Sequence, residues 1–314
     1  MTDDTGGLAR RVTETIPASL ADVRIDRVVS LIADVSRSAA AALIEAGAVT
    51  LDGAVVTAGK EKVENGQTIT VDITKANGPE LPSPDSSKKL DIVHVDDDVI
   101  VVNKPAGLVV HPGAGNKAGT MVNYLLAAYP EIAQVGDPMR PGIVHRLDAG
   151  TTGLIVVART QHAYESLVEQ LTTRSVTRVY SVIVWGIPAS LNGVIDAPIG
   201  RDQRDPTRMA VVVDGRASRT HYAVEQSFHE PKEASLVECR LETGRTHQIR
   251  VHLASIGHPV VGDAQYGGVR AGLRAGRPML HARELAFDHP RTGERRSFST
   301  PAPADFTALV ALLS

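Results

Sequence analysis

The stretch "PGIVHRLDAGTTGLIVVART", Pro141–Thr160, decides how the second half of the chain is interpreted. Its apolar run from Leu154 to Ala158 predicts a buried strand. Just before that run, Asp148 lies at a glycine-rich bend, two residues after Arg146. A carboxylate in this position fits a structural Asx turn, and it fits a functional site on a loop equally well. The stretch alone leaves both interpretations open.

The length and composition indicate an ordinary globular protein with more than one domain. The chain has 314 residues, of which 43% are hydrophobic and 22% are charged. No apolar run approaches the roughly 20 residues that a bilayer requires, and the N-terminus lacks the apolar core of a secretory signal. The single cysteine, Cys239, excludes an internal disulfide and a cysteine-rich zinc site. We therefore expect a cytoplasmic protein without a membrane partner.

The net charge of −3 does not by itself indicate a nucleic-acid-binding protein. The charge is uneven, however, because the segment 238–296 contains ten arginines, no lysine and six acidic residues. Arginine without lysine favours bidentate contacts to phosphate or bases. A solvated arginine-rich surface would give the same count, so charge alone leaves both interpretations open.

Composition and periodicity divide the chain into four parts. Residues 1–13 are predicted to be disordered, and residues 14–75 to form a small α/β domain with two helices, an Asp-Gly hairpin and a further strand. Residues 76–89 contain three prolines among small polar residues and are typical of a linker. Residues 90–314 form the second domain.

The second domain is predicted to be α+β. Many short apolar segments with hairpin-like spacing indicate a mixed, mainly antiparallel sheet, and two helical segments flank it. One helix follows Thr160 as N-cap. The other includes Gln248 and Arg250, with Thr246 as its predicted N-cap and Gly257 as its stop.

The sequence offers no motif for a cofactor or a metal. The glycine-rich stretch 113–120 lacks both the Walker A and the dinucleotide-binding spacings. His247 and His252 are five residues apart, so they do not share a helix face as a metalloprotease pair would. We therefore expect neither an organic cofactor nor a metal ion.

Three side chains suggest chemistry together with Asp148. Tyr180 lies within an apolar strand, where a buried phenol needs a polar partner. Arg250 has apolar neighbours on a short helix, with Arg245 near the start of that helix. A buried arginine is costly without an anion, and Asp148 would be such a partner. An ionised aspartate with arginine and tyrosine fits nucleophilic or electrostatic catalysis at carbon.

Several blocks resemble the pseudouridine synthases, in the family of ribosomal large subunit pseudouridine synthase D. "HRLDAGTTG" at 145–153 is similar to the H-R-L-D-x-x-T-S-G motif of that family. The other blocks follow in the family's order: "NKPAGLVVHP" at 103–112, "RVYSVIVWG" at 178–186, "TGRTHQIRVHLASIGHPVVGDAQYG" at 243–267 and "LHARELAFDHP" at 280–290. The N-terminal segment resembles the small RNA-binding domain named after the fourth small-subunit ribosomal protein. Two departures are small: Thr152 replaces the usual serine, and Val179 stands where lysine is common.

The resemblance implies isomerisation of uridine to pseudouridine in structured RNA, with the target base flipped into the site. It implies that Asp148 is the catalytic carboxylate, that Tyr180 packs on the uracil and that Arg250 pairs with Asp148. It also implies that Arg146 handles the displaced strand. We expect further RNA contacts from His145, Arg245 and His247, and from Arg24, Arg27, Arg37 and Lys60 in the N-terminal domain.

Three alternatives accompany this interpretation. The chain could be a catalytically silent RNA-binding or ribosome-assembly factor, or a glycosidase that releases the base. The third alternative keeps the chemistry and takes tRNA as the substrate. The appended N-terminal domain favours large-subunit ribosomal RNA, by analogy at the level of the fold. A monomer is the default expectation.

Overall fold

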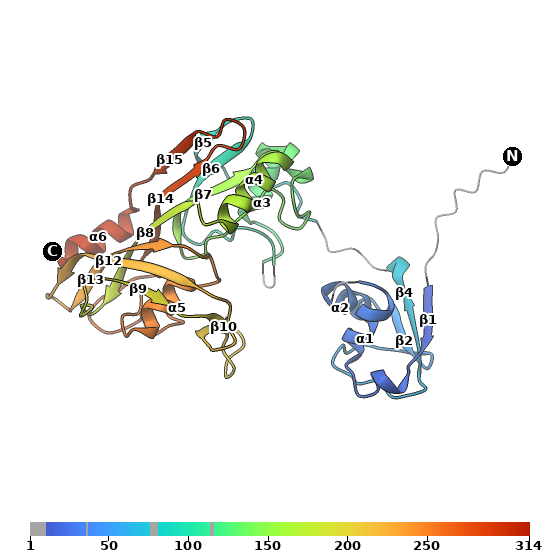
Figure 1. Ribbon diagram of the computed structural model, residues 1–314. Coiled ribbons are helices and arrows are strands. Elements are labelled where there is room, and N and C mark those ends of the chain that lie inside the picture. The colour runs from blue at the N-terminus through green and yellow to red at the C-terminus, as the bar shows by residue number, and fades with distance from the viewer. Residues whose placement is uncertain (1–10, 36, 76–80, 114–115) are drawn as a thin grey trace. The chain divides into compact units, whose positions relative to one another are not determined.

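The computed structural model describes residues 11–35, 37–75, 81–113 and 116–314 (Figure 1). Residues 1–10 of the segment predicted to be disordered, five linker residues and residues 114–115 of the glycine-rich stretch lie outside this description. The chain forms two compact units, Met1–Leu81 and Pro82–Ser314.

The first unit packs two helices against a four-stranded antiparallel sheet with the order β1-β4-β2-β3. Its elements are β1 (Arg11–Thr15), η1 (Ala18–Leu20), α1 (Ile25–Ile32), α2 (Arg37–Glu45), β2 (Val49–Leu51), β3 (Ala54–Val55), β4 (Thr68–Asp72) and η2 (Ile73–Lys75). Val28 of α1 and Leu43 of α2 are buried with Val71 of β4 in one core. Asp52 and Gly53 have positive φ and form the two-residue turn between β2 and β3 that the Asp-Gly pair predicts.

The prediction of disorder is wrong for residues 11–13, which belong to β1. This edge strand pairs antiparallel with β4, with Arg11 opposite Asp72 and Thr13 opposite Thr70. Arg11 also forms an ion pair of 3.1 Å with Asp72. Backbone pairing, not burial, holds the strand, and its polar composition gave no sign of that pairing.

The second unit begins at Pro82, eight residues before its predicted start at Leu90. Asn123 explains the difference, because its side-chain nitrogen donates to Ser83 O over 2.7 Å and its backbone oxygen accepts from Asp85 N over 2.9 Å. Residues 83–85 are therefore bound to the helix that contains Asn123.

A nine-stranded sheet forms the centre of the second unit. Its order is β5-β6-β7-β14-β8-β13-β12-β9, and β15 pairs with β14. β7 and β14 run parallel and all the other pairs are antiparallel, which confirms the predicted α+β class with a mixed, mainly antiparallel sheet. The strands are β5 (Asp91–Val95), β6 (Val99–Lys104), β7 (Thr152–Ala158), β8 (Thr177–Trp185), β9 (Asn192–Asp196), β12 (Arg219–Phe228), β13 (Ala234–Leu241), β14 (Leu280–Asp288) and β15 (Arg295–Ser299).

Helices cover both faces of this sheet, because side chains of each strand alternate between the faces. Val182 of β8 faces a core shared with α3 (Met121–Ala128) and α5 (Gln248–Ser255). Ile183 faces the opposite core, shared with α6 (Ala304–Leu313), while α4 (Gln161–Thr172) covers β6 and β7 on that side. The site described below lies on the face that carries α5.

A short η3 (Pro130–Gln134) and a separate two-stranded ribbon, β10 (Ile199–Arg201) with β11 (Met209–Val211), complete the unit (Figure 1). Throughout the described ranges, we find no helix whose length and apolar character would allow it to cross a membrane.

Gly153 sets how closely β7 approaches β14. Its φ is +108°, and a Cβ at this position would lie 2.2 Å from Ala282 O. Only glycine fits such an approach, so the second glycine of "HRLDAGTTG" lets the loop before β7 join the parallel strand pair. The next residue upstream, Thr152, binds His281 Nδ1 through its hydroxyl over 3.0 Å. This contact uses the hydroxyl that threonine shares with serine.

Candidate active site

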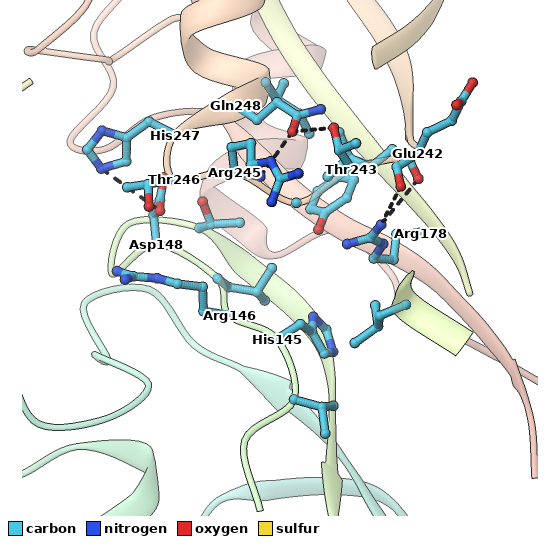
Figure 2. A pocket seen from close by; sticks show the side chains of 18 of the residues that line it. His145, Arg146, Asp148, Arg178, Glu242, Thr243, Arg245, Thr246, His247 and Gln248 are labelled. Carbon is cyan, nitrogen blue, oxygen red and sulfur yellow. Dashed lines mark hydrogen bonds and ion pairs between the residues drawn. The ribbon is translucent and has the colours of Figure 1, made fainter. Parts of the chain in front are cut away.

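A cavity of about 530 Å³ lies between the loop before β7, the start of β8 and the N-terminal end of α5 (Figure 2). It brings together all seven residues of the second unit that were predicted to act in catalysis or RNA binding. These are His145, Arg146, Asp148, Tyr180, Arg245, His247 and Arg250. Segments that are about a hundred residues apart in the chain therefore meet at one site.

Asp148 and Arg250 form the central pair of the cavity. Arg250 Nη1 donates to Asp148 Oδ2 over 3.0 Å, and the two side chains are 9% and 18% exposed. This contact occupies one carboxylate oxygen of Asp148. The other oxygen, Oδ1, has His247 Nε2 at 3.9 Å, which is too long for a hydrogen bond.

Arg250 is itself held in place by Asp263, which was not predicted from the sequence. Arg250 Nε and Nη2 donate to the two oxygens of Asp263 over 2.6 and 3.0 Å, and Nη2 also donates to Gln265 over 3.0 Å. Its guanidinium lies over the ring of Tyr266, 5.0 Å from the centroid. Burial alone would lower the pKa of Arg250, but the two carboxylates outweigh it and hold the pKa above its ordinary value. The guanidinium is therefore a permanent cation with a fixed orientation.

Two further buried basic side chains support the loop that carries Asp148. Lys104 Nζ, which is fully buried, donates to the backbone oxygens of Pro105, Leu108 and Ala149 over 3.0, 2.9 and 3.1 Å. Arg277 Nη1 donates to Gly150 O over 3.1 Å. Burial lowers the pKa of Lys104 to about 7, while the charge of Asp148 opposes that change. The two residues after Asp148 are thus held by side chains from outside the loop.

His145 is a neutral ring in this site and not a cationic RNA contact. Its Nε2 accepts a hydrogen bond from Val156 N over 3.1 Å, which assigns the proton to Nδ1. Burial, together with the charge of Arg178, lowers the pKa of His145 to about 3. The ring thereby ties the loop before β7 to the middle of that strand.

His247 precedes the first residue of α5, Gln248, and the prediction of Thr246 as the N-cap of this helix is wrong. His247 is the N-cap and has left-handed backbone geometry, with a φ of +57°. Its Nδ1 lies 2.8 Å from Tyr266 Oη, and burial lowers the pKa of the ring. Residues other than glycine rarely adopt this left-handed conformation, so the sequence alone gave no reason to place the cap at His247.

Tyr180 is buried in the core on the α5 face and borders the cavity. Burial raises the pKa of its phenol. The polar partner expected for its hydroxyl is missing, because no described residue forms a hydrogen bond with Tyr180 Oη. The hydroxyl can therefore bind a group that enters the cavity.

Arg146 and Arg245 are exposed at this site. Figure 2 shows that the side chains of Arg146 and His145 leave the loop in different directions. Within the described residues, Arg146 has no hydrogen bond and no ion pair. Arg245 Nε makes a long contact of 3.4 Å to Ala217 O, and the Arg245 backbone nitrogen donates to Gln248 over 3.0 Å.

The four candidate RNA contacts of the first unit lie around the N-terminus of α1. All four are exposed: Arg24, Arg27, Arg37 and Lys60. Arg24 pairs with Asp26 over 2.7 Å and lowers the pKa of Asp26, while burial opposes this effect. The charge of Arg37 makes a smaller contribution that also lowers the pKa of Asp26. Gly59, beside Lys60, accepts a hydrogen bond from Asp26 N. These cations therefore share one end of the helix.

One trio of side chains has the spacing of metal ligands. Ligand atoms of Asp96, Asp98 and His289 lie within 4.8 Å of one another. Arg291 already binds both oxygens of Asp98, over 2.6 and 2.8 Å. The cation requirement of Asp98 is met by arginine, so we assign no metal to the trio.

Lys104, Asp263 and Arg277 were not identified from the sequence. Lys104 gave one usable signal, since it ends a strand of five other residues of which four are valines or isoleucine. A charged residue at the end of such a strand suggests a specific buried partner. Asp263 and Arg277 gave no comparable local signal.

Known proteins are similar to this chain over most of its length. The family model described as RNA pseudouridylate synthase matches residues 98–255, and that of the S4 domain matches residues 23–69. An RNA pseudouridine synthase of Chloroflexus aurantiacus, described as uncharacterized, is 47% identical over 94% of this chain and 91% of its own length. A ribosomal large subunit pseudouridine synthase D of Vibrio vulnificus is 43% identical over 96% of this chain and 94% of its own. The solved structure of human RNA pseudouridylate synthase domain containing 1 is 30% identical, has a TM-score of 0.56 and covers 70% of this chain and 86% of its own.

Proposed function

The chain belongs to the RNA pseudouridylate synthase family, and from that premise we propose that it isomerises uridine to pseudouridine in large-subunit ribosomal RNA. Relatives named for the large ribosomal subunit match nearly the whole chain, including the first unit, which supports this substrate. Such a role would belong to ribosome biogenesis in the cytoplasm.

The observation that carries the proposal is the pair of Asp148 and Arg250 beside Tyr180 in one cavity. The reaction breaks the bond between N1 of uracil and C1′ of the ribose, and then forms a bond between C5 and C1′. The C5 proton is lost and N1 gains one, so the isomerisation is redox-neutral. A stacked base cannot reach Asp148, so the uridine must first be flipped into the cavity.

Asp148 is the catalytic carboxylate in this proposal. Arg250 occupies Oδ2, which leaves Oδ1 facing the cavity for the reaction. Oδ1 either attacks the sugar or the base, or it removes a sugar proton to give a glycal. Arg250 is a positioning residue, because it acts on the substrate through Asp148.

Tyr180 and Arg146 have separate roles. The ring of Tyr180 packs on the flipped uracil, and its unpartnered hydroxyl lies where the C5 proton is handled. The exposed guanidinium of Arg146 holds the strand from which the uridine has left, since guanidinium groups stack on bases and bind phosphate.

The remaining candidates bind RNA outside the reacting base. Arg245 and the basic end of α1 in the first unit contact phosphates. His145 contributes as a neutral donor through Nδ1, and His247 flanks Asp148.

The proposal is tested by mapping pseudouridines across total cellular RNA with and without the gene, and after its return. We expect specific positions in large-subunit ribosomal RNA to lose pseudouridine and then to regain it. Loss of pseudouridine confined to tRNA would show that tRNA is the substrate instead of ribosomal RNA. An unchanged map would contradict the proposed activity. Release of free uracil from RNA by the purified protein would indicate a glycosidase.

A further inference from the structure

Arg178 is a buried arginine without an anionic partner. Three arginines are buried in the described part of the chain: Arg178, Arg250 and Arg277. Arg250 binds Asp263 and Asp148, and Arg277 binds both oxygens of Asp305 over 2.7 and 2.8 Å. Arg178, which is 6% exposed, forms no ion pair with any described residue.

The hydrogen bonds of Arg178 are also incomplete. Its Nη2 makes long contacts to Leu241 O and Glu242 O, at 3.5 and 3.3 Å. Its buried Nε has no partner, and no described residue accepts a hydrogen bond from Nη1. The carboxylate of Glu242 is not free to compensate, because it binds Arg174 and His221 over 2.6 Å each.

Arg178 lies against the space where the uridine would enter. It is two residues before Tyr180 on β8, so both side chains point to the same face of the sheet, and both line the cavity. The loop after β13 passes over the guanidinium so closely that a Cβ on Gly244 would lie 2.7 Å from Nη1. Figure 2 shows Arg178 beside Glu242 at the end of the cavity away from Asp148.

Burying the guanidinium of Arg178 without an anion is energetically costly in the protein without RNA. Burial lowers the pKa of Arg178, and Tyr180 is the group that opposes this effect. A buried cation is ordinarily retained only with a partner of opposite charge. The cavity lining as a whole also has more positive than negative side chains, since it includes six arginines and two carboxylates.

We propose that Arg178 binds a phosphodiester of the RNA backbone adjacent to the flipped uridine. This inference rests on the proposed function and adds a phosphate subsite at the end of the cavity away from Asp148. The anion is a phosphate because RNA supplies one at every nucleotide, whereas uracil offers neutral acceptors. Arginine binds such oxygens through charge-assisted hydrogen bonds, and Nη1 is the donor that has no partner.

The test compares RNA binding by the wild type, Arg178→Gln and Arg178→Lys, using a fragment that contains a mapped target uridine. We expect Arg178→Gln to raise Kd about tenfold and to reduce the slope of log K against log salt by about 1, because one phosphate contact is lost. Arg178→Lys should recover part of both effects. Arg240→Gln is the matched control, since Arg240 is an exposed arginine paired with Glu238 outside the cavity lining.

Neutral methylphosphonates, placed singly on either side of the target uridine, identify the contact. One of them should weaken binding by the wild type about tenfold and leave Arg178→Gln unaffected. If Arg178→Gln keeps the wild-type Kd and salt slope, the subsite is overturned. An unchanged Kd with a slower single-turnover rate also overturns it, because the guanidinium would then act on the base.

If Arg178→Gln does not fold, Gly244→Ala gives a second test. The new methyl group displaces Nη1 of Arg178, while the variant retains the arginine itself. A raised Kd with a reduced salt slope supports the subsite, and unchanged values overturn it. Failure of the proposed function looks different, because the wild type itself would then convert no uridine in the fragment.

Discussion

Arg250 Nη1 donates to Asp148 Oδ2 over 3.0 Å, although the two residues are 102 positions apart in the chain. The pair is asymmetric, because Arg250 is fixed by Asp263 while Asp148 keeps one oxygen without a hydrogen bond. Arg250 is thus held in a fixed orientation by Asp263, and in the proposed mechanism the oxygen of Asp148 without a hydrogen bond is the reactive atom. The exposed Arg146 has no part in this pairing.

Asp263→Asn should impair catalysis, although Asp263 acts only through Arg250 and does not contact the substrate. The amide cannot hold Arg250 Nε and Nη2 as the carboxylate does, so Arg250 loses its fixed orientation and Asp148 is no longer aimed. We expect kcat to fall roughly 10- to 100-fold with little change in KM. Asp98→Asn is the control, since Asp98 is also buried and pairs with Arg291 away from the cavity. Equal kinetic losses in both variants would reduce Asp263 to a general stabilising role.

Arg146→Ala should separate base flipping from folding. Arg146 is exposed and has no described partner, so we expect the free energy of unfolding to change by less than about 0.5 kcal/mol. Single-turnover conversion should fall strongly, because the displaced strand is no longer held. A fluorescent base analogue next to the target uridine reports flipping directly. A fluorescence change equal to that of the wild type would contradict the role of Arg146.

Lys104 should make stability depend on pH above neutrality. Its pKa is about 7 in the folded protein and 10.5 in the unfolded chain, so unfolding takes up a proton between these values. Stability therefore rises as the pH rises from 7 towards 10.5. At about 1.4 kcal/mol for each pKa unit, the gain is on the order of a few kcal/mol. Urea unfolding of the wild type and of Lys104→Met at pH 7 and 9.5 checks this gain. If the two proteins differ in free energy of unfolding by the same amount at both pH values, the prediction is wrong.

Gly153→Ala should destabilise the protein by roughly 3 kcal/mol or more, because the new Cβ would lie 2.2 Å from Ala282 O. Gly293→Ala is the control, as its φ of +70° is also positive but nothing lies within 4 Å of a Cβ there. We expect Gly293→Ala to cost about 1 kcal/mol. Thermal denaturation of both variants measures the difference, and similar losses would show that backbone strain alone explains the glycine.

The sequence predicted those parts of the fold that depend on local pattern. The apolar run after Gly153 became β7, and the Asp-Gly pair at 52–53 became a hairpin turn. Residues 11–13 could not be predicted, because β1 exists only through its pairing with β4, more than fifty residues away. The start of the second unit was likewise set by a distant contact, that of Asn123 with residues 83–85.

The residues of the site likewise include some that the sequence predicted and some that only the fold brings together. Asp148, Tyr180 and Arg250 stand in short motifs, and their meeting in one cavity agrees with what the sequence suggested. The support from Lys104 and Asp263 depends on carbonyl and guanidinium groups brought close by the fold. An arginine in an apolar strand, such as Arg178, is visible in the sequence, but its lack of a partner is visible only in the structure.

The most direct measurement of the central claim is pseudouridine formation by Asp148→Asn on the mapped RNA fragment. Arg250 keeps Asp263 in this variant, so the fold and RNA binding should persist with a Kd close to that of the wild type. We predict that no pseudouridine forms when the enzyme exceeds the RNA, because the amide can neither attack nor accept a proton as the carboxylate does. Residual pseudouridine formation by this variant would contradict the assignment of Asp148 as the catalytic residue.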